Sequence, residues 1–552
     1  MSELMMDARR RKAVIAEATH GVFDLAIVGG GINGAGIAHD AALRGLKVCL
    51  IEQRDLAFGT SSRSSKLIHG GLRYLEHYHF RLVFEGTNER ALLRKLAPHL
   101  VRPLLFALPV YETDRHPLWK IEVGMWMYDG LSLFKTEHRH VALRSAKRLL
   151  EREPLLRADG LTGGIIYYDC LTDDARLTFE NALAAVRLGS PVITQAKVVG
   201  IDGLHDRNQP CVVRVQDQLD GGRELEIKAR GVVNASGVWT DSVRRAAAVE
   251  GSLLRPTKGV HLVLPHSRLP VSHAVAMIAP QDGRVFFAIP WNKRTVIGTT
   301  DTDEKVDPNA TKVTAADVEY LLSATNHAFP SASLAARDVI AAWAGYRPLI
   351  KAPEAENASD VPREHQIFRD GRMVSIAGGK LTTYRRMAAE TVDAAIDVAG
   401  CRAQESSTAQ ARLPGAIGLD VDLEVLAARI SERSGVAEDV ATRLAHVYGM
   451  RAFGVLEYLG KGERVTADRD VLMAEVSHAV ERELALTLED VMVRRTSLAL
   501  TASDQGRGAA EKVADLMAQT LGWDAATKNK NLDDYARAVD LTVAFRSETR
   551  AA

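Results

Sequence analysis

A glycine-rich turn near the N-terminus carries the most specific chemistry in the sequence. Gly29, Gly31 and Gly34 form a GxGxxG pattern between a predicted strand and a predicted helix. In such a turn the first glycine permits the tight bend, the second lets the backbone approach a pyrophosphate, and the third lets the helix pack closely. The helix N-terminus favours the phosphate charge. Glu52, at the end of the next predicted strand, can accept hydrogen bonds from both ribose hydroxyls. The pattern predicts a site for an ADP-containing dinucleotide.

Three further segments favour FAD over NAD as that dinucleotide. Residues 60–66 (TSSRSSK) are a run of small hydroxyl side chains that suits a loop against an extended cofactor. Residues 232–237 (VVNASG) predict a strand that ends in small residues, where the backbone can touch a ligand closely. Residues 378–383 (GGKLTT) open another helix, whose N-terminus can stabilise an anion such as the N1–C2=O edge of a reduced flavin. The sequence has no second GxGxxG pattern for a nicotinamide cosubstrate.

The elements that must position these residues form an α/β pattern. A strand at 23–28, a helix at 35–44 and a strand at 47–51 predict one βαβ unit. Later strands and helices alternate less regularly, and the chain after about residue 410 has helical periodicity throughout. We therefore expect an α/β FAD-binding Rossmann-like domain interleaved with an antiparallel-sheet substrate domain, followed by an all-α C-terminal domain. The predicted boundaries are 21–105, 160–257 and 345–408 for the FAD-binding domain, 106–159 and 258–344 for the substrate-binding domain, and 409–552 for the helical domain.

Composition sets outer limits on the function. The chain has 552 residues with 70 basic and 70 acidic side chains, so a general nucleic-acid binder with a broad basic surface is not expected. Four widely spaced cysteines without a CxxC pair predict free buried thiols in a reducing compartment. No signal-peptide core and no apolar run of transmembrane length occur. We expect a cytoplasmic protein, with attachment to a membrane surface left open.

A series of longer motifs resembles the aerobic, FAD-dependent glycerol-3-phosphate dehydrogenases, within the D-amino-acid-oxidase-like flavoprotein superfamily. The motifs are GGGINGAGIA (29–38), TSSRSSKLIHGGLRYLE (60–76), YDCLTDDARL (168–177), NASGVW (234–239), KGVHLVLP (258–265), GYRPL (345–349) and GGKLTTYRRMA (378–388). The resemblance implies oxidation of sn-glycerol 3-phosphate to dihydroxyacetone phosphate, with FAD as hydride acceptor and a membrane quinone as electron acceptor. It also implies peripheral attachment to the cytoplasmic face of the inner membrane and a homodimer.

The same resemblance suggests roles for particular residues. Arginine is suited to bidentate recognition of a phosphate, and Arg347, Arg363 and Arg73, with the Tyr74 hydroxyl, are the expected substrate-binding residues. His261 is the expected base, because imidazole titrates near the working pH. Arg347 and Lys380 are expected beside it in the catalytic group, with Lys380 also near the flavin. In addition to the glycine turn and Glu52, the expected FAD-binding residues are Thr60, Ser61, Ser65, Lys66, His69, Gly237, Gly379, Lys380, Leu381 and Thr382. No metal site is expected.

Some alternatives stay open at this stage. A glycerophosphate oxidase that uses oxygen would share these motifs, although the short interval between Arg347 and Lys380 leaves no room for the extra insertion typical of such relatives. A non-catalytic FAD-binding protein, with the helical tail as an interaction module, is a third possibility. His69 competes with His261 for the role of base, and Asp301 could be purely structural.

Overall fold

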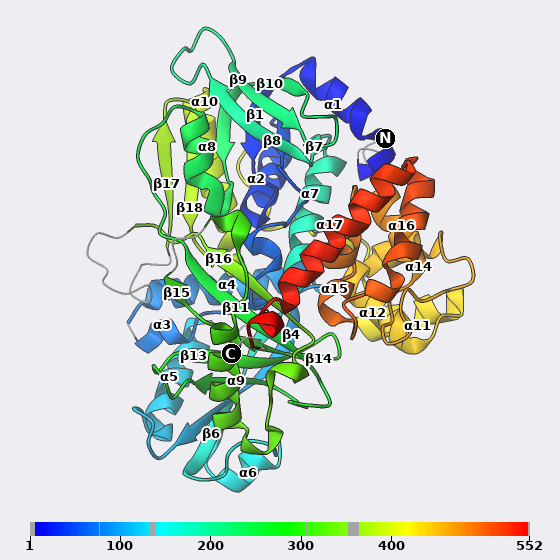
Figure 1. Ribbon diagram of the computed structural model, residues 1–552. Helices are drawn as coiled ribbons and strands as arrows, with labels where there is room; N and C mark the ends of the chain where they lie inside the picture. The colour runs from blue at the N-terminus through cyan, green and yellow to red at the C-terminus, as the bar shows by residue number, and fades with distance from the viewer. Residues whose placement is uncertain (1–5, 77, 133–138, 304–306, 352–363, 550–552) are drawn as a thin grey trace.

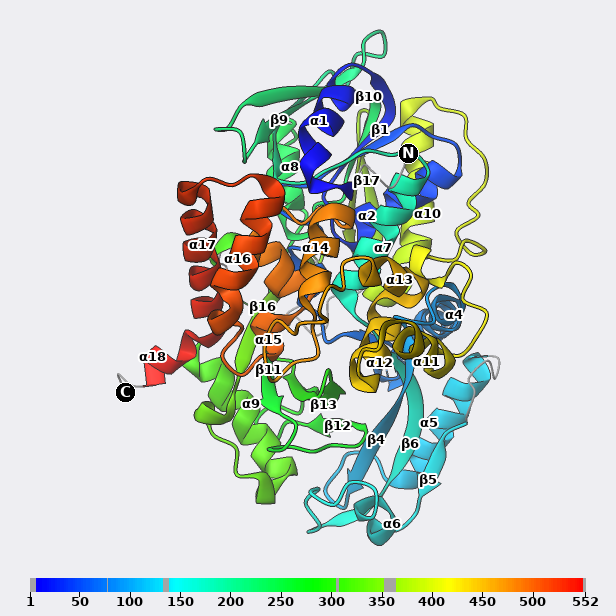
Figure 2. The same ribbon diagram turned by 90° about the vertical axis from the view of Figure 1, so that its right-hand side faces the viewer.

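The computed structural model describes residues 6–76, 78–132, 139–303, 307–351 and 364–549. Figure 1 shows two sheets placed one below the other along the molecule, with the helices of the C-terminal part on one flank. Figure 2 shows those helices in front of the junction between the two sheets.

The upper sheet forms around strand β1 (Val22–Val28), which pairs in parallel with β2 (Val48–Ile51) and β10 (Glu224–Asn234). Leu25 and Ile27 of β1 pack into one apolar cluster with helix α2, whereas Phe23 and Ala26 pack into a second cluster on the opposite face. Both faces are buried, as is usual for a parallel sheet covered by helices. Within the described residues the sheet has eight strands, in the order β17-β18-β10-β1-β2-β7, with β9 paired to β10 and β8 paired to β9. The other strands are β7 (Val192–Ile193), β8 (Ala196–Asp202), β9 (Cys211–Asp217), β17 (His365–Asp370) and β18 (Met373–Gly378).

Helices cover both faces of this sheet, among them α8 (Thr240–Ala246) on the face that carries Phe23 and Ala26. α2 (Ile32–Leu43), α7 (Asp174–Arg187) and α10 (Tyr384–Ala399) pack together on the face that carries Leu25 and Ile27. The N-terminal helix α1 (Arg11–Thr19) packs on the other face. This is the predicted Rossmann-like architecture.

The lower sheet is mainly antiparallel and has ten strands within the described part of the chain, in the order β15-β11-β14-β13-β12-β4-β6-β3, with β16 on β11 and β5 on β6. The predicted division does not follow this sheet: β3 and β6 (Leu161–Leu171) pair in it although they fall within the predicted FAD-binding segments, and the boundaries at 105/106 and 344/345 cut within β4 and β16 (Ala341–Arg347). The remaining strands are β3 (Leu67–Ile68), β4 (Arg102–Tyr111), β5 (Val141–Leu143), β11 (Thr257–Pro265), β12 (Ala274–Ile278), β13 (Val285–Trp291), β14 (Arg294–Gly298) and β15 (Thr302–Asp303).

The C-terminal part is helical as predicted. It holds two apolar clusters of its own, one around Leu426 and Leu444 and the other around Val476 and Val513. Its helices are α11 (Leu423–Ser434), α12 (Glu438–Tyr448), α13 (Ala452–Leu456), α14 (Met473–Arg482), the π-helical segment η12 (Asp490–Arg495), α15 (Leu498–Thr501), α16 (Arg507–Leu521), α17 (Ala525–Val543) and α18 (Phe545–Thr549).

Two further expectations can be checked on the fold. All four cysteines lie in the described residues and are free and buried, as predicted. Among the described helices none has the length and apolar character needed to cross a membrane. The basic cluster at residues 9–12 is partly structural, because Arg11 is buried in an ion pair with Asp217 at 2.9 Å.

Candidate functional site

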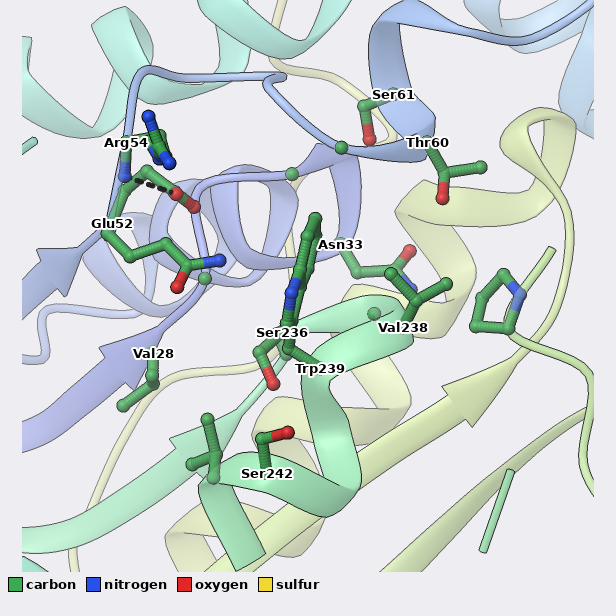
Figure 3. A pocket seen from close by; sticks show the side chains of 18 of the residues that line it. Val28, Asn33, Glu52, Arg54, Thr60, Ser61, Ser236, Val238, Trp239 and Ser242 are labelled. Carbon is green, nitrogen blue, oxygen red and sulfur yellow. Dashed lines mark hydrogen bonds between the residues drawn. The ribbon is translucent and has the colours of Figure 1, made fainter. Parts of the chain in front are cut away.

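A cavity of about 780 Å³ lies at the carboxyl ends of the parallel strands β1, β2, β10 and β18 (Figure 3). This edge of an open α/β sheet is where such folds bind ligands, and the volume suits a small molecule. One end is formed by the residues that follow β1 and β2, and the other by the turn after β18. The predicted residues in its lining are Gly29, Gly31, Glu52, Thr60, Ser61, Gly237, Gly379, Lys380 and Leu381.

The glycine turn has the conformation that its sequence predicts. Gly29 has a φ of +111°, and a Cβ there would lie 2.6 Å from the carbonyl oxygen of Ala235. A Cβ on Gly34 would overlap the carbonyl oxygen of Gly29, so only glycine permits this close packing of α2. Gly31 is the residue before the helix, and its backbone lines the cavity. The turn therefore presents bare backbone and a helix N-terminus to a ligand.

Glu52 is buried at the same end of the cavity. Its carboxyl oxygens accept hydrogen bonds from the backbone N–H groups of Gly30 at 2.6 Å and Arg54 at 2.8 Å; Figure 3 shows the second of these. Burial raises the pKa of Glu52 to about 7, against the lowering effect of those two hydrogen bonds. Each carboxylate oxygen has a second lone pair, so the group can also accept from ribose hydroxyls.

The other end of the cavity combines an open backbone with a cation. Gly379 has a φ of +84°, and Lys380 next to it lines the cavity with its ammonium 3.6 Å from the centre of the Tyr74 ring. Thr60 joins this region to the lower sheet by donating a hydrogen bond to the carbonyl oxygen of Tyr346 at 2.6 Å. A positive charge here is suited to a reduced flavin, which is anionic.

Five of the predicted cofactor residues are not in the cavity lining; one of them is Gly34, which packs against Gly29. Lys66 is buried in an ion pair with Asp174 at 2.7 Å. Ser65 is hydrogen-bonded through Oγ to Nε2 of His261 at 2.8 Å. Thr382 and His69 are joined through the Thr382 hydroxyl and the His69 backbone at 3.2 Å. These residues lie outside the lining, and their role in cofactor binding stays a prediction.

The predicted substrate residue Arg347 and the predicted base His261 lie on two neighbouring strands of the lower sheet. Arg347 ends β16, is half-buried, and donates to Asp301 at 2.6 Å and to the Thr299 hydroxyl at 3.3 Å. His261 lies on β11, whose register places Thr257 opposite Arg347 and His261 opposite Trp343. Asp301, which the sequence suggested only as a structural residue, is thus the carboxylate that orients Arg347.

His261 is enclosed between aromatic and cationic groups. Its ring stacks on Trp343 with the centres 5.0 Å apart, and its Nδ1 is buried without a hydrogen-bond partner among the described residues. Burial, together with the nearby charges of Arg347 and Lys66, lowers the pKa of His261 well below its ordinary value. The imidazole is therefore neutral at physiological pH.

Two predicted substrate residues cannot be placed in full. Arg73 begins the short helix α3 (Arg73–Glu76), but its side chain lies outside the described residues, and Arg363 lies outside them entirely. Tyr74 is described and packs under Lys380.

The cavity also holds residues that sequence reasoning did not single out. Trp239 is part of the cavity lining, and Figure 3 shows its ring at the centre of the view, beside Asn33 and Ser236 and above Ser242. Trp239 belongs to the NASGVW motif, two residues after Gly237 with its φ of +58°. An aromatic residue two positions after a glycine turn at a strand end is the signal that could have indicated it.

The donor set of the cavity fits a flavin dinucleotide. The glycine turn and the α2 N-terminus suit a pyrophosphate, Glu52 suits a ribose, and Lys380 suits an anionic ring edge. No group of His, Cys, Asp and Glu side chains suited to a metal ion occurs within the described residues.

Comparison with known proteins agrees with this geometry. Residues 24–384 match the family described as FAD dependent oxidoreductase, and residues 406–528 match the C-terminal domain of alpha-glycerophosphate oxidase. The aerobic glycerol-3-phosphate dehydrogenase of Bacillus subtilis is 35% identical over 540 residues, which are 95% of this chain and 96% of the relative. Glycerol-3-phosphate dehydrogenase 2 of Mycobacterium bovis is 39% identical over 95% of this chain and 89% of the relative. The glycerol-3-phosphate dehydrogenase from Bacillus halodurans, solved as a complex with FAD, superimposes with a TM-score of 0.81 at 34% identity, covering 98% of both chains.

Proposed function

The chain belongs to the FAD-dependent oxidoreductase family, and on that premise we propose that it oxidises sn-glycerol 3-phosphate at C2 to dihydroxyacetone phosphate. FAD, the cofactor of the family, supplies the acceptor for the hydride when bound. The observation that carries the proposal is the likeness to relatives named glycerol-3-phosphate dehydrogenase over 95% of this chain. The position of Arg347 supports it, because the next residue, Pro348, lines the cavity at the Lys380 end.

Arg347 is the proposed phosphate-binding residue. Its guanidinium is held by Asp301, by the Thr299 hydroxyl and by the carbonyl oxygen of Thr300 at 3.2 Å. A guanidinium held in one direction loses little conformational entropy when it binds a phosphate. We place Arg73, Tyr74 and Arg363 as further substrate contacts.

His261 is the proposed acceptor of the hydroxyl proton. The neutral ring has one nitrogen bonded to Ser65, which fixes its orientation, and Nδ1 without a partner among the described residues. Loss of the proton from the C2 hydroxyl would accompany departure of the hydride from the same carbon. Lys380 would stabilise the negative charge that the reaction places on the flavin.

The proposed electron acceptor is a membrane quinone, with the protein attached to the cytoplasmic face of the inner membrane and forming a homodimer. An exposed apolar face supports the membrane attachment. Helix α5 (Leu118–Leu131) buries Met125 and Tyr128 toward the protein, yet it is apolar on its outer side as well. The exposed apolar side chains of that side are Trp119, Val123, Trp126 and Met127.

The composition and place of the α5 face suit a lipid surface. Its four side chains share one face at helical spacing, and Trp119 is 67% exposed. Tryptophan favours the boundary between lipid and water, and the exposed Lys120 of the same helix suits anionic headgroups. α5 packs on α4 (Phe80–Leu96), which contacts η9 (Leu381–Thr383) at the Lys380 end of the cavity. Figures 1 and 2 show α5 on the outside, away from α16 and α17.

An anaerobic titration tests cofactor, substrate and chemistry together. Addition of glycerol 3-phosphate to the purified holoenzyme should bleach the visible flavin absorption. Arg347→Ala should keep its flavin but need at least about tenfold more substrate for the same bleaching, since a charged hydrogen bond is worth about 1.5–3 kcal/mol. A flavin that stays oxidised with saturating substrate would favour the non-catalytic FAD-binding alternative.

The acceptor needs a separate measurement. With a short-chain quinone, electrons should appear as quinol with little peroxide. Stoichiometric peroxide in air would identify the oxygen-using glycerophosphate oxidase instead.

A further inference from the structure

The C-terminal helical domain reaches the back of the cofactor cavity through Asp55. Residues 52–54 and 59–61 line the cavity, so Asp55 belongs to the loop that forms one of its walls. The Asp55 carboxylate is fully buried on the side of this loop that meets the C-terminal domain. Arg494 and Arg495, two consecutive residues of η12, both bind it there.

The three side chains form a dense set of charged hydrogen bonds. Arg495 donates from Nη1 and Nη2 to the two carboxylate oxygens of Asp55, at 2.8 and 2.9 Å. Arg494 donates to the same carboxylate from Nε at 2.6 Å, and its guanidinium lies 5.6 Å from the ring centre of Phe58 in the same loop. A bidentate arginine–carboxylate pair fixes direction as well as distance. The loop is thus held at two points, Asp55 and Phe58.

Both arginines are anchored in their own domain. Arg494 also donates to Glu489 at 2.8 Å and Asp490 at 2.6 Å, and Arg495 donates to the carbonyl oxygen of Glu483 at 2.9 Å. Adjacent side chains of an α-helix do not face each other, but this segment is π-helical, a form frequent at functional sites. The C-terminal domain therefore presents a rigid pair of guanidinium groups to the loop.

On its other side the same loop holds the dinucleotide turn. Ala57 donates its N–H to the carbonyl oxygen of Gly30 at 3.0 Å, and Gly30 donates its own N–H to Glu52. The Phe58 ring lies against Trp239, with the centres 6.3 Å apart. A displacement of Asp55 would therefore move the glycine turn, the ribose carboxylate and the aromatic ring in the cavity together.

We propose that Arg494 and Arg495 are positioning residues for FAD, which hold the adenosine side of the cavity in its binding shape through Asp55. Docking of the C-terminal domain and binding of FAD are then coupled. Coupling between two binding events is reciprocal, so bound FAD stabilises the docked domain by the same factor.

The test is a titration of the full-length apoprotein with FAD, followed by fluorescence. Asp55→Asn keeps the shape of the side chain but removes its charge, and it should raise the Kd for FAD by about ten- to a hundredfold, within the usual range of such coupling. Glu180→Gln is the matched control. Glu180 is buried, pairs with Arg451 of the C-terminal domain at 2.8 Å, and lies outside the cavity lining.

Both variants should lower the unfolding temperature, because each replaces the carboxylate partner of a buried arginine with a neutral amide. Only Asp55→Asn should weaken FAD binding. Arg495→Lys is a milder second variant, since it keeps the charge but loses the bidentate contact, and it should weaken FAD binding several-fold.

Hydrogen exchange supplies a readout that does not depend on turnover. FAD should slow exchange of the η12 amides in the unmodified protein and not in Asp55→Asn. An unchanged Kd for FAD in both Asp55→Asn and Arg495→Lys, or an equal loss in Glu180→Gln, would overturn the proposal. Because FAD affinity is measured without substrate, this outcome is separate from the fate of the proposed oxidation.

Discussion

At the scale of a single residue, the protonation state of Glu52 makes FAD binding depend on pH. Its pKa of about 7 arises mainly from burial, which penalises the charged carboxylate. Ribose hydroxyls donate hydrogen bonds to a carboxylate and so favour the charged form. FAD binding should lower the pKa of Glu52 and release a proton. The folded apoprotein, in contrast, binds this proton more tightly than the unfolded chain, so Glu52 makes the apoprotein less stable as pH rises from about 4.5 to about 7.

The affinity for FAD should consequently fall as pH drops below 7. Linkage gives at most a tenfold rise in Kd per pH unit, until the pKa of Glu52 in the complex is reached. Glu52→Gln cannot titrate, so its Kd should be higher than that of the unmodified protein at pH 8 and should change little down to pH 6. FAD titrations at pH 6, 7 and 8 check this. Asp220→Asn, which alters an exposed carboxyl group, is the control and should keep the full pH dependence. An equal pH slope in Glu52→Gln would contradict the assignment.

The sequence predicts the conformation of some site residues, but it does not predict the contacts of others. The conformations of Gly29 and Gly34 follow from local sterics, which a motif specifies by itself. Arg347 pairs with Asp301, which lies 46 positions earlier between β14 and β15, so composition and spacing cannot reveal the contact. The same holds for Asp55, whose partners lie 439 and 440 positions later in the chain.

At the scale of elements, boundaries could be predicted where a local signal exists. Helix α9 (Ala315–Ala328) has such a signal, because a capping box between Thr314 and Asp317 defines its start. Helix α2 begins at Ile32 rather than at the predicted Ala35. Its first turn therefore includes Gly34, where the missing Cβ permits close packing against the backbone of Gly29. β6 could not be assigned to a sheet from the sequence, since its partners β3, β4 and β5 are chosen by long-range pairing.

The outer face of α5 gives a prediction for one element. Trp119→Ser combined with Trp126→Ser should lower binding to vesicles of anionic phospholipid by at least about tenfold. Removal of a large apolar side chain from water contributes about 1.5–3 kcal/mol to the binding free energy, and serine does not supply this contribution. Vesicle co-sedimentation measures this. Binding of the unmodified protein should persist in moderate salt, since the contact is mainly apolar.

A matched control distinguishes this face from exposed apolar residues in general. Leu541 is 51% exposed on α17, a helix that Figures 1 and 2 show away from α5, so Leu541→Ser should bind vesicles like the unmodified protein. Release of the unmodified protein by salt alone would argue against an apolar contact. Reduction of the flavin by glycerol 3-phosphate should be unaffected in both variants.

For the whole molecule, the sequence predicted three kinds of structure but not how they are joined. The Rossmann-like sheet, the antiparallel sheet and the helical tail each follow from local patterns of polarity and glycine. Their junctions consist of buried ion pairs such as Arg176–Glu483 and Arg451–Glu180. Equal totals of acidic and basic residues gave no sign of them, because pairing depends on where the folded chain brings each charge.

Buried histidines make the stability of the whole molecule depend on acid pH. Burial lowers the pKa of His39 and of His99 from 6.5 to about 4. The unfolded chain then binds more protons than the folded one between about pH 6.5 and pH 4, so the free energy of unfolding falls as pH decreases through this window. Each of these histidines would account for about 3 kcal/mol over the full window, at about 1.4 kcal/mol per pKa unit.

His99 is the better residue for testing this origin of acid sensitivity. Both of its ring nitrogens are buried without a partner among the described residues, so the folded protein offers a protonated ring no acceptor. Urea unfolding of the holoenzyme at pH 7 and pH 5 should show a smaller loss of stability for His99→Gln than for the unmodified protein. His205→Gln changes an exposed ring and should reproduce the unmodified curve. If His99→Gln loses as much stability between pH 7 and pH 5 as the unmodified protein, groups other than this buried imidazole take up the protons.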